Sequence, residues 1–230
     1  KLNDAFFFLD KDFQVIDTFR CGNGYLTDLH ELVFTPSGNV LLMSYDPQII
    51  DMSQIVQGGN PAATVIGLII QEIDPSKDAV VFQWRSWDHF DILDATQLDF
   101  TMQNVDYVHG NAIEYDQDGN LLISSRHMDE ITKINRSTGQ IMWRLGGLNN
   151  QFTFINDALK FSYQHDIRRL ENGNITLYDN GNFHSPQFSR AVEYTLDEVN
   201  KTATLVWEYR NTPTIYGRAM GSAKRLPNGN

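Results

Sequence analysis

Three histidines occupy the same place in three similar segments of the chain: His30, His109 and His165. Each is followed by a short segment that we predict to be a strand, then a Gly-Asn turn and a second predicted strand. Repeated units place their equivalent positions around a common centre. A single histidine at the start of a strand is explained by a hydrogen bond to the backbone, whereas three in register favour a functional site. We therefore expect these imidazoles to converge.

Further polar side chains lie close to these histidines in the sequence. Arg126 and His127 end a Ser-Ser-Arg-His segment, and a guanidinium group holds anionic oxygens in a planar fork. Asn111 follows His109 by two positions, so both side chains point to the same side of an extended strand. Such an amide can donate to an oxyanion or fix the tautomer of a ring. We interpret His89 and His127 as residues that surround the substrate.

This set of side chains narrows the chemistry. Three histidines could bind zinc, but no pair of ligands at a short metal-binding spacing is present, so we expect no metal and no cofactor. A neutral imidazole can instead attack phosphorus or sulfur, while arginine and asparagine donors stabilise the charge on the transferred group. No glycine-rich phosphate loop is present. The set suits sulfuryl or phosphoryl transfer through a covalent histidine intermediate.

The elements that must position these residues are short strands. Gly-Asn turns begin at Gly38, Gly119, Gly173 and Gly229, and the last three recur at about 55 residues, the period of a propeller blade. The longer first interval indicates an insertion at 46–63. Within one unit we predict strands at 121–125, 130–135 and 140–144, with a turn at 136–139. We predict an all-β fold, a β-propeller, in which a hairpin over 6–19 closes an earlier blade.

The order of these units predicts how the domain is organised. The chain begins late in one blade, contains about three full blades and stops inside another. A propeller needs a closed ring to protect its edge strands. We therefore expect residues 1–230 to form a single β-propeller domain that is a fragment of a longer chain.

Composition excludes several classes of function. The net charge of -11 and the pI near 4.8 argue against nucleic acid and anionic membrane surfaces as partners. No apolar run approaches the roughly 20 residues that a membrane-spanning helix needs, so we expect no membrane insertion. Cys21 is the only cysteine, so no disulfide can form within the chain. We recognise no signal peptide, so we expect the segment to be cytoplasmic, already processed or excised from a longer chain.

Several longer motifs resemble those of the arylsulfotransferase family, of the type independent of 3'-phosphoadenosine phosphosulfate. The resemblance is strongest over 84–182 and rests on four segments, the last followed by Tyr178–Gly181: Asp106–Ile113, Leu122–His127, Lys133–Gly147 and Phe161–Asp166. It implies a six-bladed propeller with its site at the central channel. It also implies transfer of a sulfuryl group from a phenolic sulfate ester to a phenol by a ping-pong mechanism.

The resemblance also implies roles for individual residues. The transiently sulfurylated histidine of the family matches His165, and its His-x-Asn pair matches His109 and Asn111. Its channel arginine matches Arg126, and a histidine from an earlier blade matches His30. These are the residues that we predict to be catalytic.

The sequence thus predicts an aryl-sulfate sulfotransferase that works through a sulfo-histidine intermediate, with a phenolic sulfate donor and a phenol acceptor as its partners. We expect a periplasmic or secreted location and leave room for a homo-oligomer. A second hypothesis is a non-catalytic β-propeller binding module, secreted or on a surface. A third is a metal-dependent hydrolase or lyase. The matched histidines and Arg126 favour the first, because a binding module has no need of them.

Overall fold

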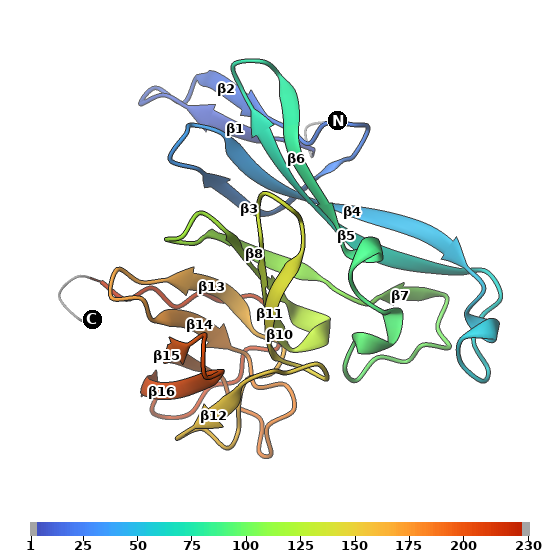
Figure 1. The fold of residues 1–230 in the computed structure, drawn as a ribbon, viewed down its shortest axis with the longest axis vertical. Helices are drawn as coiled ribbons and strands as arrows, with labels where there is room; N and C mark the ends of the chain where they lie inside the picture. The colour runs from blue at the N-terminus through green and yellow to red at the C-terminus, as the bar shows by residue number, and fades with distance from the viewer. Residues whose placement is uncertain (1–3, 227–230) are drawn as a thin grey trace. The chain divides into compact units, whose positions relative to one another are not determined.

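The computed structural model describes residues 4–226, and these residues form β-strands with four single-turn 3-10 helices (Figure 1). The prediction of an all-β fold is confirmed. The chain divides into two compact units. Unit 1 comprises Lys1–Asp91 and Leu98–Gly110, and unit 2 comprises Ile92–Gln97 and Asn111–Asn230. Within the described residues, no helix is both long enough and apolar enough to cross a membrane.

Unit 1 contains a hairpin and a larger sheet. The predicted hairpin over 6–19 is observed as β1 (Phe6–Leu9) and β2 (Val15–Phe19). The larger sheet has the order β3-β4-β5-β6, and β7 pairs in parallel with β5. Its strands are β3 (Thr27–Phe34), β4 (Val40–Ile50), β5 (Ala63–Asp74), β6 (Ala79–Arg85) and β7 (Asn104–Asp106). Two 3-10 turns accompany them, η1 (Met52–Gln54) and η2 (Ser86–Asp88). Phe19 packs with Val40, Leu42 and Ile73, so the hairpin shares a core with this sheet.

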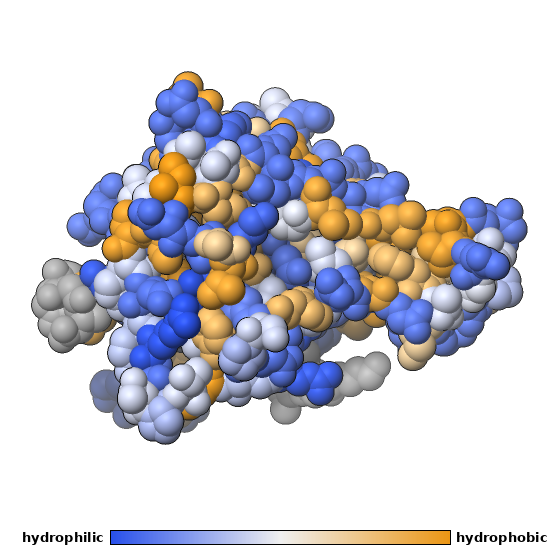
Figure 2. All heavy atoms as spheres, turned by 90° about the horizontal axis from the view of Figure 1, so that it is seen from below, coloured by the Kyte–Doolittle hydropathy of each residue, from blue (hydrophilic) through white to orange (hydrophobic). Residues whose placement is uncertain are grey.

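The predicted insertion at 46–63 does not form a loop along its whole length. It extends β4 and β5 into a long hairpin that closes around η1 and reaches the right of Figure 1. Pro47 pairs with Ile66, and beyond Ser44 the far edge of β4 has no partner in β3. Proline is tolerated there because it removes no hydrogen bond from a ladder. In Figure 2 apolar side chains gather along this hairpin, and its exposed apolar residues include Ile49 and Ile55.

Unit 2 contains two sheets. The first has the order β11-β10-β9-β8 and the second the order β12-β16-β15-β14-β13. The first sheet has β8 (Gly110–Tyr115), β9 (Leu121–Ser125), β10 (Glu130–Ile134) and β11 (Ile141–Gly146). The second has β12 (Thr153–Ile155), β13 (His165–Arg169), β14 (Ile175–Asp179), β15 (Arg190–Asp197) and β16 (Thr202–Tyr209). Two further turns are η3 (Ile92–Asp94) and η4 (Arg126–Met128).

A shared core joins the two sheets of unit 2. Trp143 and Leu122 from the first sheet belong to the same buried cluster as Ile167, Leu177 and Val192 from the second. Two buried cations add polar links between the sheets. Lys133 contacts Asp116 and Glu198, and Arg169 contacts the same two carboxylates. The two sheets therefore form one body whose strand ends are held at fixed positions.

The Gly-Asn turns repeat in structural detail. Gly38, Gly119 and Gly173 have φ values of 85°, 81° and 86°, a region that favours glycine because it has no Cβ. The side chain of the asparagine that follows each glycine forms a hydrogen bond to a residue that lies later in the same sheet or in one of its turns. The Asn39 amide donates to Glu72, the Asn174 amide donates to Glu193, and the Asn120 carbonyl accepts from the Arg136 N–H. The predicted turn at Gly229 lies outside the described residues.

Each large sheet is built mainly from four antiparallel strands in the order of the sequence. That is the internal topology of a propeller blade. The sheets are therefore consistent with the predicted propeller. The number of blades and the single domain over 1–230 stay predictions.

Candidate functional site

His165 is the first residue of β13 and is buried, with 6% of its surface exposed. Its Nδ1 lies 2.7 Å from Oδ1 of Asn180 and 3.1 Å from the carbonyl oxygen of Tyr163. Its Nε2 lies 3.3 Å from the backbone nitrogen of Met220. A backbone N–H only donates, so Nε2 is an acceptor and Nδ1 carries the proton of the neutral ring. Nε2 is therefore the unprotonated ring nitrogen, and its lone pair points toward the Met220 N–H.

Asn111 positions the chain immediately before His165. The buried Asn111 amide donates to the carbonyl of Gln164 at 2.8 Å. The side-chain amide of Gln164 in turn donates to Ser124 and to the carbonyl of Glu130. Gln164, the residue before His165, is thus held from three strands of the neighbouring sheet, β8, β9 and β10. In this arrangement Asn111 contacts the backbone next to His165, and its predicted role toward the substrate stays a prediction.

Arg126 lies in η4, directly after β9, and three groups fix its guanidinium. One nitrogen, Nη1, is 2.7 Å from Nε2 of His127, and Nη2 donates to the carbonyl of Arg218 at 3.2 Å. The guanidinium carbon lies 4.0 Å from the centre of the Tyr163 ring. Since arginine can only donate, Nε2 of His127 accepts and this histidine is neutral. Arg126 and His165 both contact the loop of residues 217–220.

Asp129 supports this arrangement through a hydrogen bond with the backbone of Tyr163. It accepts hydrogen bonds from the Tyr163 N–H at 2.6 Å and from the Thr96 hydroxyl at 2.7 Å. Burial raises its pKa to about 6, although these hydrogen bonds oppose the shift. Asp129 and Tyr163 both have positive φ values, 50° and 53°. Left-handed backbone at non-glycine residues is uncommon and gathers at functional sites.

The other two predicted catalytic histidines, His30 and His109, belong to unit 1 and lie together. Their ring centroids are 5.4 Å apart, edge to face. Nδ1 of His30 is 2.6 Å from Asp28, and Nδ1 of His109 is 2.6 Å from Asp106. Each aspartate also accepts the backbone N–H of its histidine. Each carboxylate therefore holds both the ring and the backbone of one imidazole.

The carboxylate also changes the protonation of His30. The hydrogen bond to Asp28 raises the pKa of His30, although burial opposes it. Burial alone would raise the pKa of Asp28, but the hydrogen bonds from His30 lower it overall. His30 is thus favoured as an imidazolium, which can give up a proton.

The sequence analysis did not single out these two aspartates. The signal was present as Asp28-x-His30 and Asp106-x-x-His109, where the short spacing lets one carboxylate reach the ring and the backbone of its histidine. His30 lies inside β3, not at its start, and the register with β4 shifts between Asp28 and Leu32.

His89 lies flat against a core tryptophan. Its ring stacks on that of Trp84, with centroids 5.0 Å apart and planes 3° apart, and burial lowers the pKa of His89. His89, which directly follows η2, therefore packs against the buried Trp84. Its predicted role at the substrate stays a prediction.

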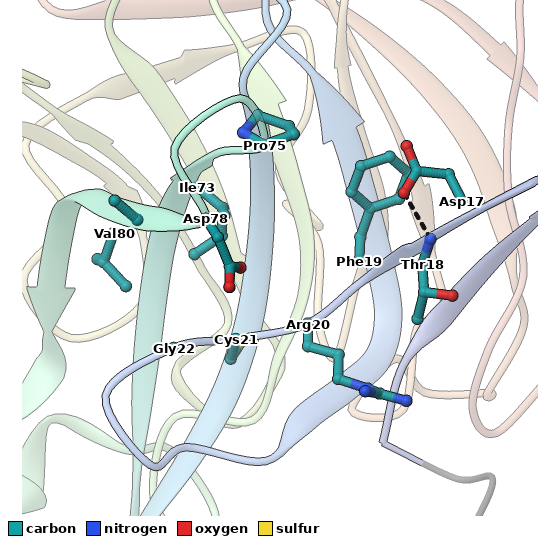
Figure 3. Close-up of a pocket in the computed structure, with 11 residues that line it drawn as sticks. Asp17, Thr18, Phe19, Arg20, Cys21, Gly22, Ile73, Pro75, Asp78 and Val80 are labelled. Atoms are coloured by element: carbon teal, nitrogen blue, oxygen red, sulfur yellow. Dashed lines mark hydrogen bonds between the residues drawn. The ribbon is translucent and has the colours of Figure 1, made fainter.

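A large hollow in unit 1 carries none of these histidines. It has a volume of about 530 Å³ and lies between the end of β2 and the turn from β5 to β6 (Figure 3). Figure 3 shows Asp17 and Thr18 beside Phe19 on one side, with Asp78 and Val80 on the other. Asp17 accepts the N–H of Thr18, its neighbour in β2.

Comparisons with known proteins identify the family of this chain. Two curated relatives are named arylsulfate sulfotransferase AssT. The protein from Escherichia coli is 25% identical over 265 residues, which covers 85% of this chain and 42% of that protein. The protein from Lelliottia amnigena is 31% identical over 137 residues, which covers 45% of this chain and 23% of that protein. The alignments thus span less than half the length of these relatives.

A solved structure of a protein of unknown function from Bacteroides caccae aligns with 90% of this chain and 54% of its own, at a TM-score of 0.45 and 15% identity. The family model described as arylsulfotransferase (ASST) matches residues 9–230. That match includes every predicted site residue. The chain therefore belongs to the arylsulfotransferase family.

Proposed function

We propose that this chain carries the nucleophile of an aryl-sulfate sulfotransferase, in which a phenolic sulfate ester gives its sulfuryl group to His165 and a phenol then removes it. The observation that carries the proposal is the state of the His165 ring. Two oxygens accept from Nδ1 and Nε2 accepts from an N–H, so the neutral ring keeps its lone pair on Nε2. Family membership and the names of the two relatives support sulfuryl transfer from an aryl sulfate.

In the first half-reaction, Nε2 of His165 attacks sulfur. A bond from nitrogen to sulfur forms as the bond from sulfur to the phenolic oxygen breaks, and the electron pair of that bond leaves with the phenolate. Arg126 serves as the donor for the sulfuryl oxygens. Its guanidinium is already oriented by His127, Arg218 and Tyr163, so little reorganisation accompanies the step.

The departing phenolate needs a proton in this proposal, and His30 is the residue best suited to supply it. The neighbouring Asp28 favours its charged form. In the second half-reaction His30 accepts the proton of the incoming phenol, whose oxygen attacks sulfur and releases neutral His165. His109, held in the same way by Asp106, serves as a further donor to the transferring group.

The intact mass of the full-length protein tests this proposal. After exposure to 4-nitrophenyl sulfate, the protein should gain the mass of one sulfuryl group and release one equivalent of nitrophenol. A phenol should then remove the added mass. His165→Ala should abolish both the mass gain and the release. If this variant still accumulates a sulfurylated enzyme, the nucleophile is another residue and the proposal is wrong.

A further inference from the structure

Asn180 directly follows β14 and is fully buried. Its side-chain nitrogen donates to the carbonyl of Gly217 at 2.7 Å and to the carbonyl of Met220 at 2.9 Å. A carbonyl oxygen only accepts, so these two contacts settle which end of the amide is nitrogen. Oδ1 is therefore the atom that faces His165.

The orientation of Asn180 has a consequence for the imidazole. Oδ1 has no proton to donate, so at 2.7 Å from Nδ1 it holds the proton of a neutral His165 on that nitrogen. The carbonyl of Tyr163 accepts from the same nitrogen at the longer distance of 3.1 Å. Only the tautomer with the proton on Nδ1 leaves a lone pair on Nε2.

The same side chain also holds the loop that faces Nε2. Gly217 and Met220, whose carbonyls accept from Asn180, lie at the two ends of the 217–220 loop. Met220 has a φ of 61° and Gly221 a φ of 105°, so the backbone turns through a left-handed conformation there. This turn aims the Met220 N–H at His165. The Gly217 N–H donates to the Ser189 hydroxyl, which in turn donates to the backbone carbonyl of Asn180.

We propose that Asn180 is a positioning residue for sulfuryl transfer: its carbonyl end holds His165 in the reactive tautomer, and its amino end holds the backbone donor that faces the reactive nitrogen. The proposal rests on the proposed function of His165. It assigns to the Tyr178–Gly181 motif a task that the sequence alone did not supply. Asn180 touches the nucleophile and the loop, and it acts on the reaction only through them.

Two variants of the full-length protein separate the two ends of the amide. Asn180→Asp keeps an oxygen beside Nδ1 and removes the donor to the loop, whereas Asn180→Ala removes both. Asn174→Ala is the matched control, because Asn174 lies at the opposite end of β14 and its amide bonds to Glu193. The measurements are the 15N chemical shifts of the His165 ring and the rate of the first half-reaction against pH with 4-nitrophenyl sulfate.

In Asn180→Ala, we expect the His165 ring to lose its uniform Nδ1–H state and the sulfurylation rate to fall by about 10²-fold or more, with little change in KM. In Asn180→Asp, we expect the ring to keep the Nδ1–H tautomer. The new carboxylate favours imidazolium, so the acid limb of the rate profile should move to higher pH and the rate at neutral pH should fall about tenfold or more. Asn174→Ala should change neither measurement.

The proposal is overturned if Asn180→Ala keeps the wild-type ring shifts and rate, or if Asn180→Asp leaves the acid limb where it is. Should Asn180→Ala fail to fold, the near-isosteric Asn180→Asp decides the matter alone. Failure of the proposed function looks different, because His165→Ala would then still become sulfurylated. The ring shifts of the Asn180 variants do not depend on that outcome.

Discussion

Lys133 provides a test of whether burial or distance decides the strength of an ion pair in this fold. Its Nζ lies 2.9 Å from Asp116 and 2.7 Å from Asp118. The Asp116 side chain is 3% exposed and that of Asp118 is 45% exposed. By distance alone the two carboxylates should matter equally. By burial, Asp116 should dominate, because removal of one partner leaves a buried charge without compensation.

The expected loss of stability depends on which carboxylates Lys133 and Arg169 keep after each substitution. Asp116→Asn removes the charge that faces Lys133 and also the carboxylate that binds Arg169 through two contacts, at 2.7 and 2.8 Å. Both cations keep Glu198, at 3.1 Å in each case. The loss should therefore lie near the lower end of the range for a broken buried pair, about 3 kcal/mol. Asp118→Asn should cost about 0–1 kcal/mol, as for exposed pairs.

Urea unfolding of the wild type and both variants measures these losses, and pH gives an independent check. Burial alone would raise the pKa of Asp116, but Arg169 and Lys133 lower it overall. A lowered pKa in the folded state means that the stabilisation is present above the unfolded value, about 3.9, and is lost as the pH falls through the folded value. The difference between wild type and Asp116→Asn should thus shrink below about pH 4. Equal losses for Asp116→Asn and Asp118→Asn at pH 7 would refute the reasoning.

Three further predictions concern the reaction. Arg126→Lys should slow sulfurylation in single-turnover assays by roughly 10²- to 10³-fold, with little change in the KM for the donor. The reason is that an ammonium group cannot hydrogen-bond to His127 and Arg218 while it stacks on Tyr163. An effect confined to KM would contradict this prediction. Asp28→Asn should lower the pKa of His30 in an NMR titration. In the wild type, the pair stabilises the fold below the unfolded pKa of histidine, and this stabilisation should disappear as the pH rises through the raised folded pKa. An unchanged titration would show that Asp28 does not set the pKa of His30. Acid should inhibit the first half-reaction, since an imidazolium has no lone pair; a rate that stays constant down to pH 4 would argue against an imidazole nucleophile.

Local patterns were sufficient to predict much of the fold. The strand predicted at 121–125 matches β9, and the strand predicted at 130–135 matches β10 to within one residue. In these strands apolar residues either alternate with polar ones or follow one another, and the turns between the strands contain glycines that need a positive φ. The limits of each strand are therefore determined by the local sequence. The insertion at 46–63 stays a prediction. The pairing of part of this segment in β4 and β5 was not predicted, because a hairpin register depends on the partner strand.

The candidate site was predictable only in part, for the same reason. His30, His109 and His165 were singled out because each heads a repeat, and their convergence stays a prediction. The partners of their rings follow no shared pattern: Asp28 and Asp106 lie at different spacings, and Asn180 comes from the next strand. Met220 meets His165 through a backbone N–H, which every residue except proline possesses. A contact of that kind leaves no mark in the sequence.

The contact between the 217–220 loop and His165 also bears on the order in which the protein is made. The two partners are 55 residues apart in the chain. A polypeptide leaves the ribosome from its N-terminus, and its parts fold in that order. The sheet that carries His165 is therefore available before the loop that faces Nε2 has been synthesised. A ribosome that stalls between β16 and this loop would display β13 and β14 while Nε2 of His165 still lacks the Met220 N–H, so the nascent chain completes this contact only after residue 220 has emerged.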